Sequence, residues 1–171
     1  MYSFITSGTY EFLVKIKKKH PSEELVLMEN ENSSFLYHET KDATIFKEPR
    51  RYEVIDSIGT VGNGRFVVFN NIPVTDEGRP LFEYQSKNRM GLIEKEPGFV
   101  AIRILRPLSS DTYVIMTVWE TEKDFKKWQQ SASFANAHSK SGKEKESILQ
   151  KKTIYPRPSY VTKYTIPKEE D

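Results

Sequence analysis

The segment Thr117–Trp128, which reads TVWETEKDFKKW, decides the fold because it joins a strand to a helix at a defined residue. Its first residues are mostly β-branched or aromatic, as in a strand that packs on both faces. The letters TEKD then form a variant of the capping box, with Thr121 as the N-cap and Asp124 at the third helical position. Phe125 and Trp128 follow as an apolar stripe at helical spacing. The segment therefore predicts a strand followed directly by an amphipathic helix.

The rest of the second half extends this unit in both directions. The predicted elements are, in order, a strand at Arg65–Val74, a helix within Glu77–Lys95, strands at Phe99–Leu105 and Tyr113–Glu120, the helix after Thr121, and a strand at Ser159–Ile166. This β-α-β-β-α-β order is that of the ferredoxin-like fold.

The first half follows the same plan but lacks its second helix. Its predicted elements are a strand at Tyr2–Thr6, a helix at Glu11–His20, and strands at Leu25–Asn30, Ser34–His38 and Arg51–Ile58. The turn signal at 62–64, Gly-Asn-Gly, marks the boundary between the halves. We therefore expect an α+β protein of the dimeric α/β-barrel type. A partial ferredoxin-like half at 1–64, without a site, would pair with a ferredoxin-like domain at 65–171 to form a fused pseudo-dimer.

Composition excludes several functions. The formal net charge of the 171 residues is only +2, so the chain shows no excess of basic residues for binding nucleic acid. It contains no cysteine, which excludes disulfides and zinc–thiolate sites. Its apolar stretches are far shorter than the ~20 residues of a membrane span, and its first residues do not resemble a secretory signal. We therefore expect a cytoplasmic protein that acts without a membrane.

The three histidines lie in different surroundings. His20 follows three lysines at a helix end and His38 lies beside a glutamate on a strand, so both are expected to be solvated. His138 ends the run FANAH, in which Phe134 lies one helical turn earlier and small residues leave room for a bulky flat ligand. Imidazole is the usual iron ligand in haem proteins. His138 is thus a candidate iron ligand, with a structural or exposed role as the alternative.

Two asparagines interrupt an apolar strand. Adjacent strand residues point to opposite faces, so either Asn70 or Asn71 should face a covered side, where an amide without partners costs about 1–3 kcal/mol. Orienting a ligand is one explanation, and a β-bulge at this point is the other. Trp128 precedes His138 by ten residues, so the two can line one pocket only if the helix bends at Ser131–Ser133.

These residues resemble a known family. The strand ending in Trp-Glu, the Phe-x-x-Trp helix and the later Ser-x-x-Phe-x-x-Ala-His pattern, which together run from Thr117 to His138, look like the antibiotic-biosynthesis-monooxygenase superfamily, specifically its Isd-type haem-degrading branch. The run EPGF at 96–99 and the strand VFNNI at 68–72 are similar to further parts of that family. The resemblance covers roughly residues 65–140.

The resemblance implies a role for each matching residue. His138 would be the proximal iron ligand, and Phe134 would contribute to the haem pocket. Asn70 would form a hydrogen bond on the distal side and help to orient oxygen, with Asn71 as the alternative. Trp128 would press on the macrocycle and favour a ruffled haem. Haem would then be both substrate and cofactor, opened with electrons from a reductase or small reductant, with release of iron.

The chain departs from most relatives, which are homodimers of single ferredoxin-like domains. Its additional first half has neither tryptophan nor the Ala-His pattern, so we expect one site per chain and a monomeric pseudo-dimer, with a homodimer as the alternative. Two other functions stay open. One is a non-enzymatic haem-binding or stress-signalling protein on the same scaffold, and the other is a cofactor-free monooxygenase acting on a small aromatic compound.

Overall fold

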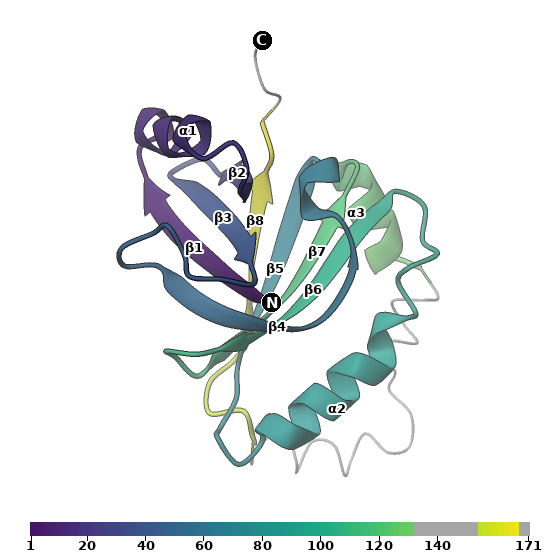
Figure 1. Cartoon of the computed structure of the whole chain (residues 1–171). Helices are drawn as coiled ribbons and strands as arrows, with labels where there is room; N and C mark the ends of the chain where they lie inside the picture. The colour runs from purple at the N-terminus through teal and green to yellow at the C-terminus, as the bar shows by residue number, and fades with distance from the viewer. Residues whose placement is uncertain (132–153, 168–171) are drawn as a thin grey trace, which may run out of the picture.

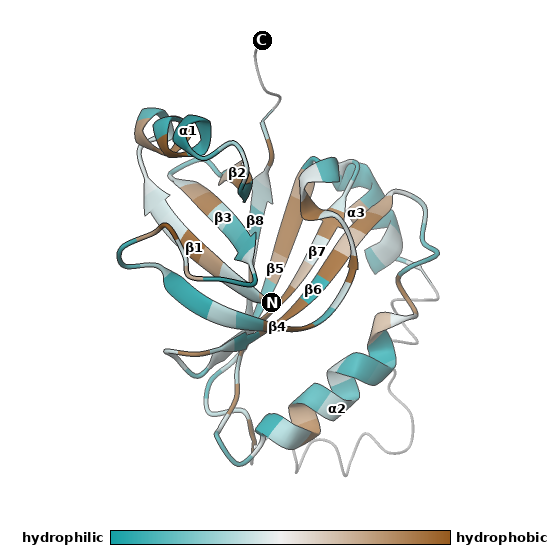
Figure 2. Cartoon of the chain, in the orientation of Figure 1, coloured by the Kyte–Doolittle hydropathy of each residue, from teal (hydrophilic) through white to brown (hydrophobic). Residues whose placement is uncertain are grey.

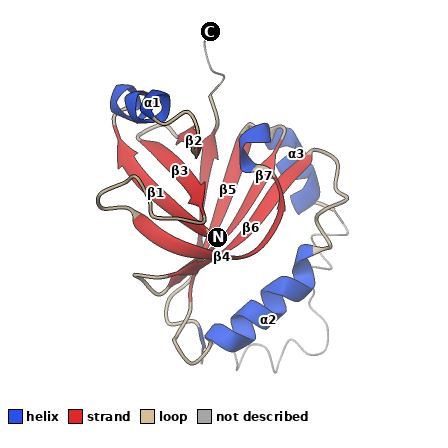
Figure 3. Ribbon diagram, viewed as in Figure 1, coloured by secondary structure: helices blue, strands red, loops and turns tan. Residues whose placement is uncertain are grey.

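The strands of the computed structural model, which describes residues 1–131 and 154–167, form one closed antiparallel barrel (Figures 1 and 3). Around the barrel the strands follow the order β1-β3-β2-β8-β5-β7-β6-β4. The elements are β1 (Tyr2–Gly8), α1 (Tyr10–Lys19), β2 (Glu24–Glu29), β3 (Ser34–Thr40), β4 (Arg50–Gly59), the short 3-10 helix η1 (Val61–Asn63), β5 (Phe66–Pro73), α2 (Arg79–Met90), β6 (Phe99–Pro107), β7 (Thr112–Trp119), α3 (Glu122–Gln129) and β8 (Tyr160–Thr165).

The barrel consists of two ferredoxin-like sheets. The first half contributes the order β4-β1-β3-β2 and the second half contributes β8-β5-β7-β6, which is the same order of equivalent strands. The last strand of each half pairs with the second strand of the other, as β4 with β6 and β8 with β2. This arrangement confirms the predicted α+β fold and the fused pseudo-dimer. The boundary between residues 64 and 65 as a domain limit stays a prediction.

The two seams between the halves differ in length. β4 and β6 pair along most of their length, from Tyr52–Pro107 to Gly59–Ala101, with one irregularity near Val54. β2 and β8 meet at the single pair Glu29–Thr165. The β4–β6 seam therefore provides most of the backbone hydrogen bonds that hold the halves together.

Alternate side chains of each strand fill the barrel interior. In β5, Val67 and Phe69 point inward, whereas Val68 and Asn70 point to the outer face. The inner set forms one buried cluster across both halves: Ile5, Val26, Met28, Tyr37, Tyr52, Val61, Val67, Phe69, Ala101, Leu105, Val114, Met116, Val118, Tyr164 and Ile166. A shared core of this kind makes the two halves one folding unit.

One ion pair lies inside this apolar core. Arg103 of β6 is 4% exposed, and its Nε donates to Glu39 of β3 at 2.5 Å. Its remaining N–H groups reach Glu39 and the carbonyls of Ile58, Gly59 and Ile102. All five guanidinium donors therefore have acceptors, which is the condition for burying this charge.

Helices cover the outer faces of the two sheets unequally. α1 packs on the first sheet through Leu13, whereas α2 and α3 both belong to the second sheet (Figure 1). Figure 2 shows brown apolar strands beneath helices whose surfaces are largely hydrophilic. The first sheet is covered further by Phe46, which lies in the segment that replaces the missing second helix. No helix among residues 1–131 and 154–167 has the length and hydropathy to cross a membrane.

The solvated position expected for His38 is wrong. This side chain is 0% exposed, with its ring between Phe4 and Phe46 under the first sheet's cover. Its Nδ1 lies 3.1 Å from Thr44 Oγ1 and its Nε2 lies 3.0 Å from Glu23 Oε2. A strand that is covered on both faces buries the residues at its centre whichever face they point to. A histidine is tolerated there when both ring nitrogens have hydrogen-bond partners.

Candidate functional site

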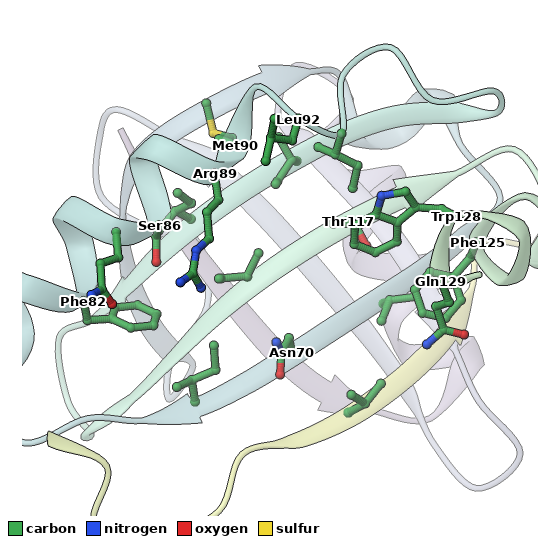
Figure 4. Close-up of a pocket in the computed structure, with 18 of the residues that line it drawn as sticks. Asn70, Phe82, Ser86, Arg89, Met90, Leu92, Thr117, Phe125, Trp128 and Gln129 are labelled. Atoms are coloured by element: carbon green, nitrogen blue, oxygen red, sulfur yellow. The ribbon is translucent and has the colours of Figure 1, made fainter. Parts of the chain in front are cut away.

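A cavity of about 360 Å³ lies between α2, α3 and the outer face of the second sheet (Figure 4). Its volume falls within the range of roughly 300–1,000 Å³ typical of small-molecule and cofactor sites. The lining residues come from four strands, from α2 and α3, and from the segments that follow α2 and precede β8: Val68, Asn70, Ile72, Phe82, Gln85, Ser86, Arg89, Met90, Leu92, Ile93, Ile102, Ile104, Ile115, Thr117, Phe125, Trp128, Gln129, Tyr155 and Val161.

The floor of the cavity is the outer face of β5, β6 and β7. Val68, Ile102, Ile104 and Ile115 cover it, one or two from each strand. Because strand side chains alternate, the same strands point their other residues into the barrel. The result is a flat apolar surface with its backbone polar groups already paired in the sheet, as a flat apolar ligand requires.

An aromatic cluster closes the α3 end of the cavity. Thr121 is the N-cap that the sequence predicts, since its side chain accepts a hydrogen bond from the Asp124 amide. Phe125 and Trp128, one turn apart, both face the cavity. The ring of Trp128 lies 5.5 Å from that of buried Trp119 and 6.1 Å from that of Phe125. Trp128 is thus a cavity residue that the core holds in position.

Asn70 and Asn71 have different surroundings. β5 pairs regularly with β7 through both residues, so the strand contains no bulge at this point. Asn71 is 4% exposed, and its Nδ2 lies within hydrogen-bonding distance of the Phe69 and Tyr160 carbonyls and Thr162 Oγ1. Asn70 lies in the middle of the cavity floor (Figure 4). The amide that lines the cavity is therefore that of Asn70, whereas the amide of Asn71 joins β5 to β8.

α2 is the opposite wall. It is shorter than the predicted range of 77–95, and it presents Phe82, Ser86 and Arg89 to the cavity at a spacing of four and three residues. Glu83, on a neighbouring face, accepts two hydrogen bonds from Arg106 of β6, at 2.8 and 2.6 Å, and one from the Tyr113 hydroxyl. This ion pair attaches α2 to the sheet.

The attachment of α2 makes stability depend on pH. Hydrogen bonds from Arg106, and then from Tyr113, lower the pKa of Glu83. A lowered carboxyl pKa stabilises the folded state above the unfolded pKa of ~4.3, and this contribution is lost as pH falls through the folded pKa. We expect Glu83→Gln to lower the thermal unfolding midpoint at pH 6, with the difference from wild type shrinking below pH ~4.

Thermal unfolding of both proteins across this pH range is the measurement. Glu94→Gln is the control, because Glu94 is exposed just beyond the same helix and forms no ion pair with the described residues. Parallel pH curves for wild type and Glu83→Gln would contradict the role given to the Glu83–Arg106 pair.

Two of the predicted site residues lie outside the part of the chain that the structure describes. These are His138 and Phe134. The structure brings Asn70 and Trp128 to one cavity, and α3 ends at Gln129, just before the serines where a bend is predicted. Within residues 1–131 and 154–167, no three acidic or histidine side chains gather closely enough to hold a metal ion.

Sequence reasoning missed the α2 wall and Tyr155. The sequence of α2 contains few apolar residues, so no hydrophobic periodicity marks the inward face that carries Ser86 and Arg89. Tyr155 lies in a proline-containing connection that carries no periodicity. Burial raises the pKa of Tyr155, and the positive charge of Arg89 partly offsets this rise. The two groups therefore face the same space.

Known proteins resemble this chain in sequence and in fold. Residues 65–140 match the family described as antibiotic biosynthesis monooxygenase. A heme-degrading monooxygenase of Listeria monocytogenes is 27% identical over 128 residues, which cover 75% of this chain and 77% of the relative. Signal transduction protein TRAP of Staphylococcus aureus is 30% identical over 141 residues, which cover 80% of this chain and 82% of the relative. The solved structure of a major regulator of staphylococcal pathogenesis has a TM-score of 0.81 at 25% identity and covers 99% of this chain and 100% of its own.

Proposed function

The chain belongs to the antibiotic biosynthesis monooxygenase family, and we propose that it is a haem-degrading monooxygenase whose site is the cavity between α2, α3 and the sheet. The observation that carries this proposal is the meeting of Asn70 and Trp128 over a flat apolar floor. Bound haem would supply the iron that activates oxygen, and its porphyrin would be opened with electrons from an external reductant or reductase. A Listeria relative named as a heme-degrading monooxygenase supports the same function.

The residues of the cavity fit a flat macrocycle. Val68, Ile104 and Ile115 offer a surface on which an extended aromatic ligand can lie while α2 and α3 border it. Burying apolar ligand surface against such a floor contributes roughly 25 cal/mol per Å² before the costs of binding are subtracted. The floor offers no ionised side chain, so a neutral ring system meets no uncompensated charge there.

Each polar or aromatic residue has a proposed task. Asn70 offers both an amide N–H donor and a carbonyl acceptor above the floor, where oxygen or a reaction product needs a hydrogen bond. The rings of Trp119 and Phe125 pack against Trp128 and restrict the movement of its side chain. Trp128 would therefore press on a ligand that fills the cavity. His138 would hold the iron, and Phe134 would contribute to the haem pocket.

We propose that the site belongs to residues 65–171 and that residues 1–64 complete the barrel without a site of their own. On the first sheet, the area equivalent to the cavity is occupied by Ile45 and Phe46, which pack with Leu36 and His38. Because this chain supplies both sheets of the barrel, a second copy is not needed to cover the site, and we propose a monomer.

Haem binding without turnover is the second candidate. The Staphylococcus aureus relative named as a signal transduction protein is 30% identical to this chain and supports a regulatory function on this scaffold. Such a protein would bind haem in the same cavity but would leave the porphyrin intact when a reductant and oxygen are present.

The test is a haemin titration of the purified chain, followed by addition of a reductant in air. We expect a bound-haem Soret band that saturates at one haem per chain and then decays as the ring opens. A stable band would favour the haem-binding regulator. The absence of any bound-haem spectrum would contradict both the haem-degrading enzyme and the regulator, and it would favour a cofactor-free monooxygenase.

Two variants of α2 show whether haem occupies this cavity. Ser86 is buried on the inward face of the helix, so Ser86→Phe would fill the cavity and should block binding. Asn88 is exposed on the outward face of the same helix, so Asn88→Phe is the matched control and should bind as wild type does. Equal binding by both variants would place haem elsewhere on the chain.

A further inference from the structure

Among the described residues that line the cavity, one carries a charge. Arg89 lies in the last turn of α2, and Figure 4 shows its side chain running from the helix toward the sheet rather than along the helix axis. Phe82 and Ser86 precede it on the same inward face. An arginine at a helix C-terminus can interact with the terminal carbonyls, but this one is directed at the space between helix and floor.

Arg89 forms no ion pair within residues 1–131 and 154–167. The only acid of α2, Glu83, already accepts hydrogen bonds from Arg106 and Tyr113. Tyr155 shares the cavity with Arg89 and offers a phenol, which can donate a further hydrogen bond to an anion. The cavity thus has a charged donor and a neutral donor on one side, and apolar residues beneath.

We propose that Arg89, assisted by Tyr155, binds a carboxylate of the ligand, so that the site selects apolar ring systems that carry an acidic arm. This inference rests on the proposed function, in which the carboxylate is a haem propionate. Arg89 is exposed to solvent and borders the cavity, and its guanidinium fork matches a carboxylate in a bidentate geometry. A neutral or positively charged ligand would gain no such hydrogen bonds from Arg89.

This contact also gives the ligand an orientation. Arg89 extends from α2, whereas Trp128 and Phe125 close the α3 end (Figure 4). Tyr155 packs against the cluster that contains Phe82 of α2 and so lies toward the α2 side. A ring held at its acidic edge by Arg89 presents its opposite, apolar edge to the aromatic cluster. Arg89 is therefore a positioning residue that determines which edge of the ring lies near Trp128.

The experiment compares two probes in the same detergent-containing buffer, haemin and the dimethyl ester of haemin, which lacks both carboxylates. We expect wild type to bind haemin roughly tenfold more tightly than the ester, as a bidentate charge-assisted hydrogen bond from an exposed arginine would give. Arg89→Leu should lose this preference by weakening haemin binding while leaving ester binding unchanged. Arg89→Lys should recover part of the preference, because it retains the charge without the fork.

Lys87→Leu is the matched control, because Lys87 is an exposed cation of the same helical turn and does not line the cavity. It should retain the full preference for haemin. Equal affinity of wild type for the two probes, or an unchanged preference in Arg89→Leu, would overturn the carboxylate assignment and leave the proposed haem function standing. Failure of wild type to bind either probe would instead overturn the proposed function and this inference with it.

Discussion

Arg103→Met should lower the free energy of unfolding by about 3–5 kcal/mol, the usual cost of removing one partner of a buried ion pair. This is a large part of the 5–15 kcal/mol that stabilises an ordinary domain. The substitution leaves the Glu39 carboxylate inside the barrel with only the Tyr37 hydroxyl, which donates to its Oε1 at 2.7 Å. It also removes the donors of the Ile58 and Gly59 carbonyls.

Urea unfolding followed by two probes is the measurement, with the midpoint and slope compared to wild type. The double variant Arg103→Met, Glu39→Met should recover part of the loss, because removing both charges leaves none uncompensated. Arg157→Met is the control. Its ion pair with Asp111 has a similar distance, 2.7 Å, but both side chains are largely exposed, so stability should change little.

The same experiment tests whether the halves fold as one unit. Arg103 lies on β6 of the second half and Glu39 on β3 of the first half, so their pair joins the two. A single unfolding transition in wild type and in Arg103→Met would agree with one shared core. A stability of Arg103→Met within 1 kcal/mol of wild type would contradict the weight given to this pair.

His138→Ala should abolish the bound-haem Soret spectrum, because imidazole coordination both holds the iron and sets its absorbance. The expected loss of haem affinity exceeds that of Arg89→Leu. Among the described residues that line the cavity there is no second histidine that could bind the iron in place of His138. Haemin titration by absorbance is the measurement, and external imidazole should restore part of the signal in the variant if the vacant coordination position is accessible.

His20→Ala is the control for this prediction, since His20 lies at the C-terminal end of α1 on the opposite half of the chain and should leave the spectrum unchanged. His38→Ala is unsuitable because the buried His38 ring would leave a cavity and unfulfilled hydrogen bonds. If His138→Ala kept the haemin affinity and spectrum of wild type, His138 would not be the iron ligand. Another residue would then have to bind the iron.

Local signals predicted most of the fold. The predicted cap at Thr121 forms, and the strands lie within a few residues of their predicted ranges, because capping and strand alternation act over a few neighbouring residues. Element order alone indicated two ferredoxin-like halves, since each β-α-β-β unit has few ways to pack. The short β2–β8 seam and the long β4–β6 seam had no counterpart in the sequence pattern.

The candidate site was predictable only in part. Asparagine is unfavourable in an apolar strand, so Asn70 and Asn71 are equally conspicuous in the sequence. They are distinguished only by the tertiary structure, in which Asn70 lines the cavity and Asn71 forms hydrogen bonds to β8. Arg89 gave no such signal, because an arginine near a helix end is ordinary. Its significance comes from the absence of an ion-pair partner within the described residues and from the apolar floor that it faces.

The elements, their order and the family motif from Thr117 to His138 can therefore be recognised from the sequence, because each depends on residues close together in the chain. Long-range packing sets which face of each strand lines the barrel interior and which lines the cavity. That choice depends on contacts between residues far apart, such as Glu39 with Arg103 and Asn71 with Thr162, and no short-range pattern encodes them.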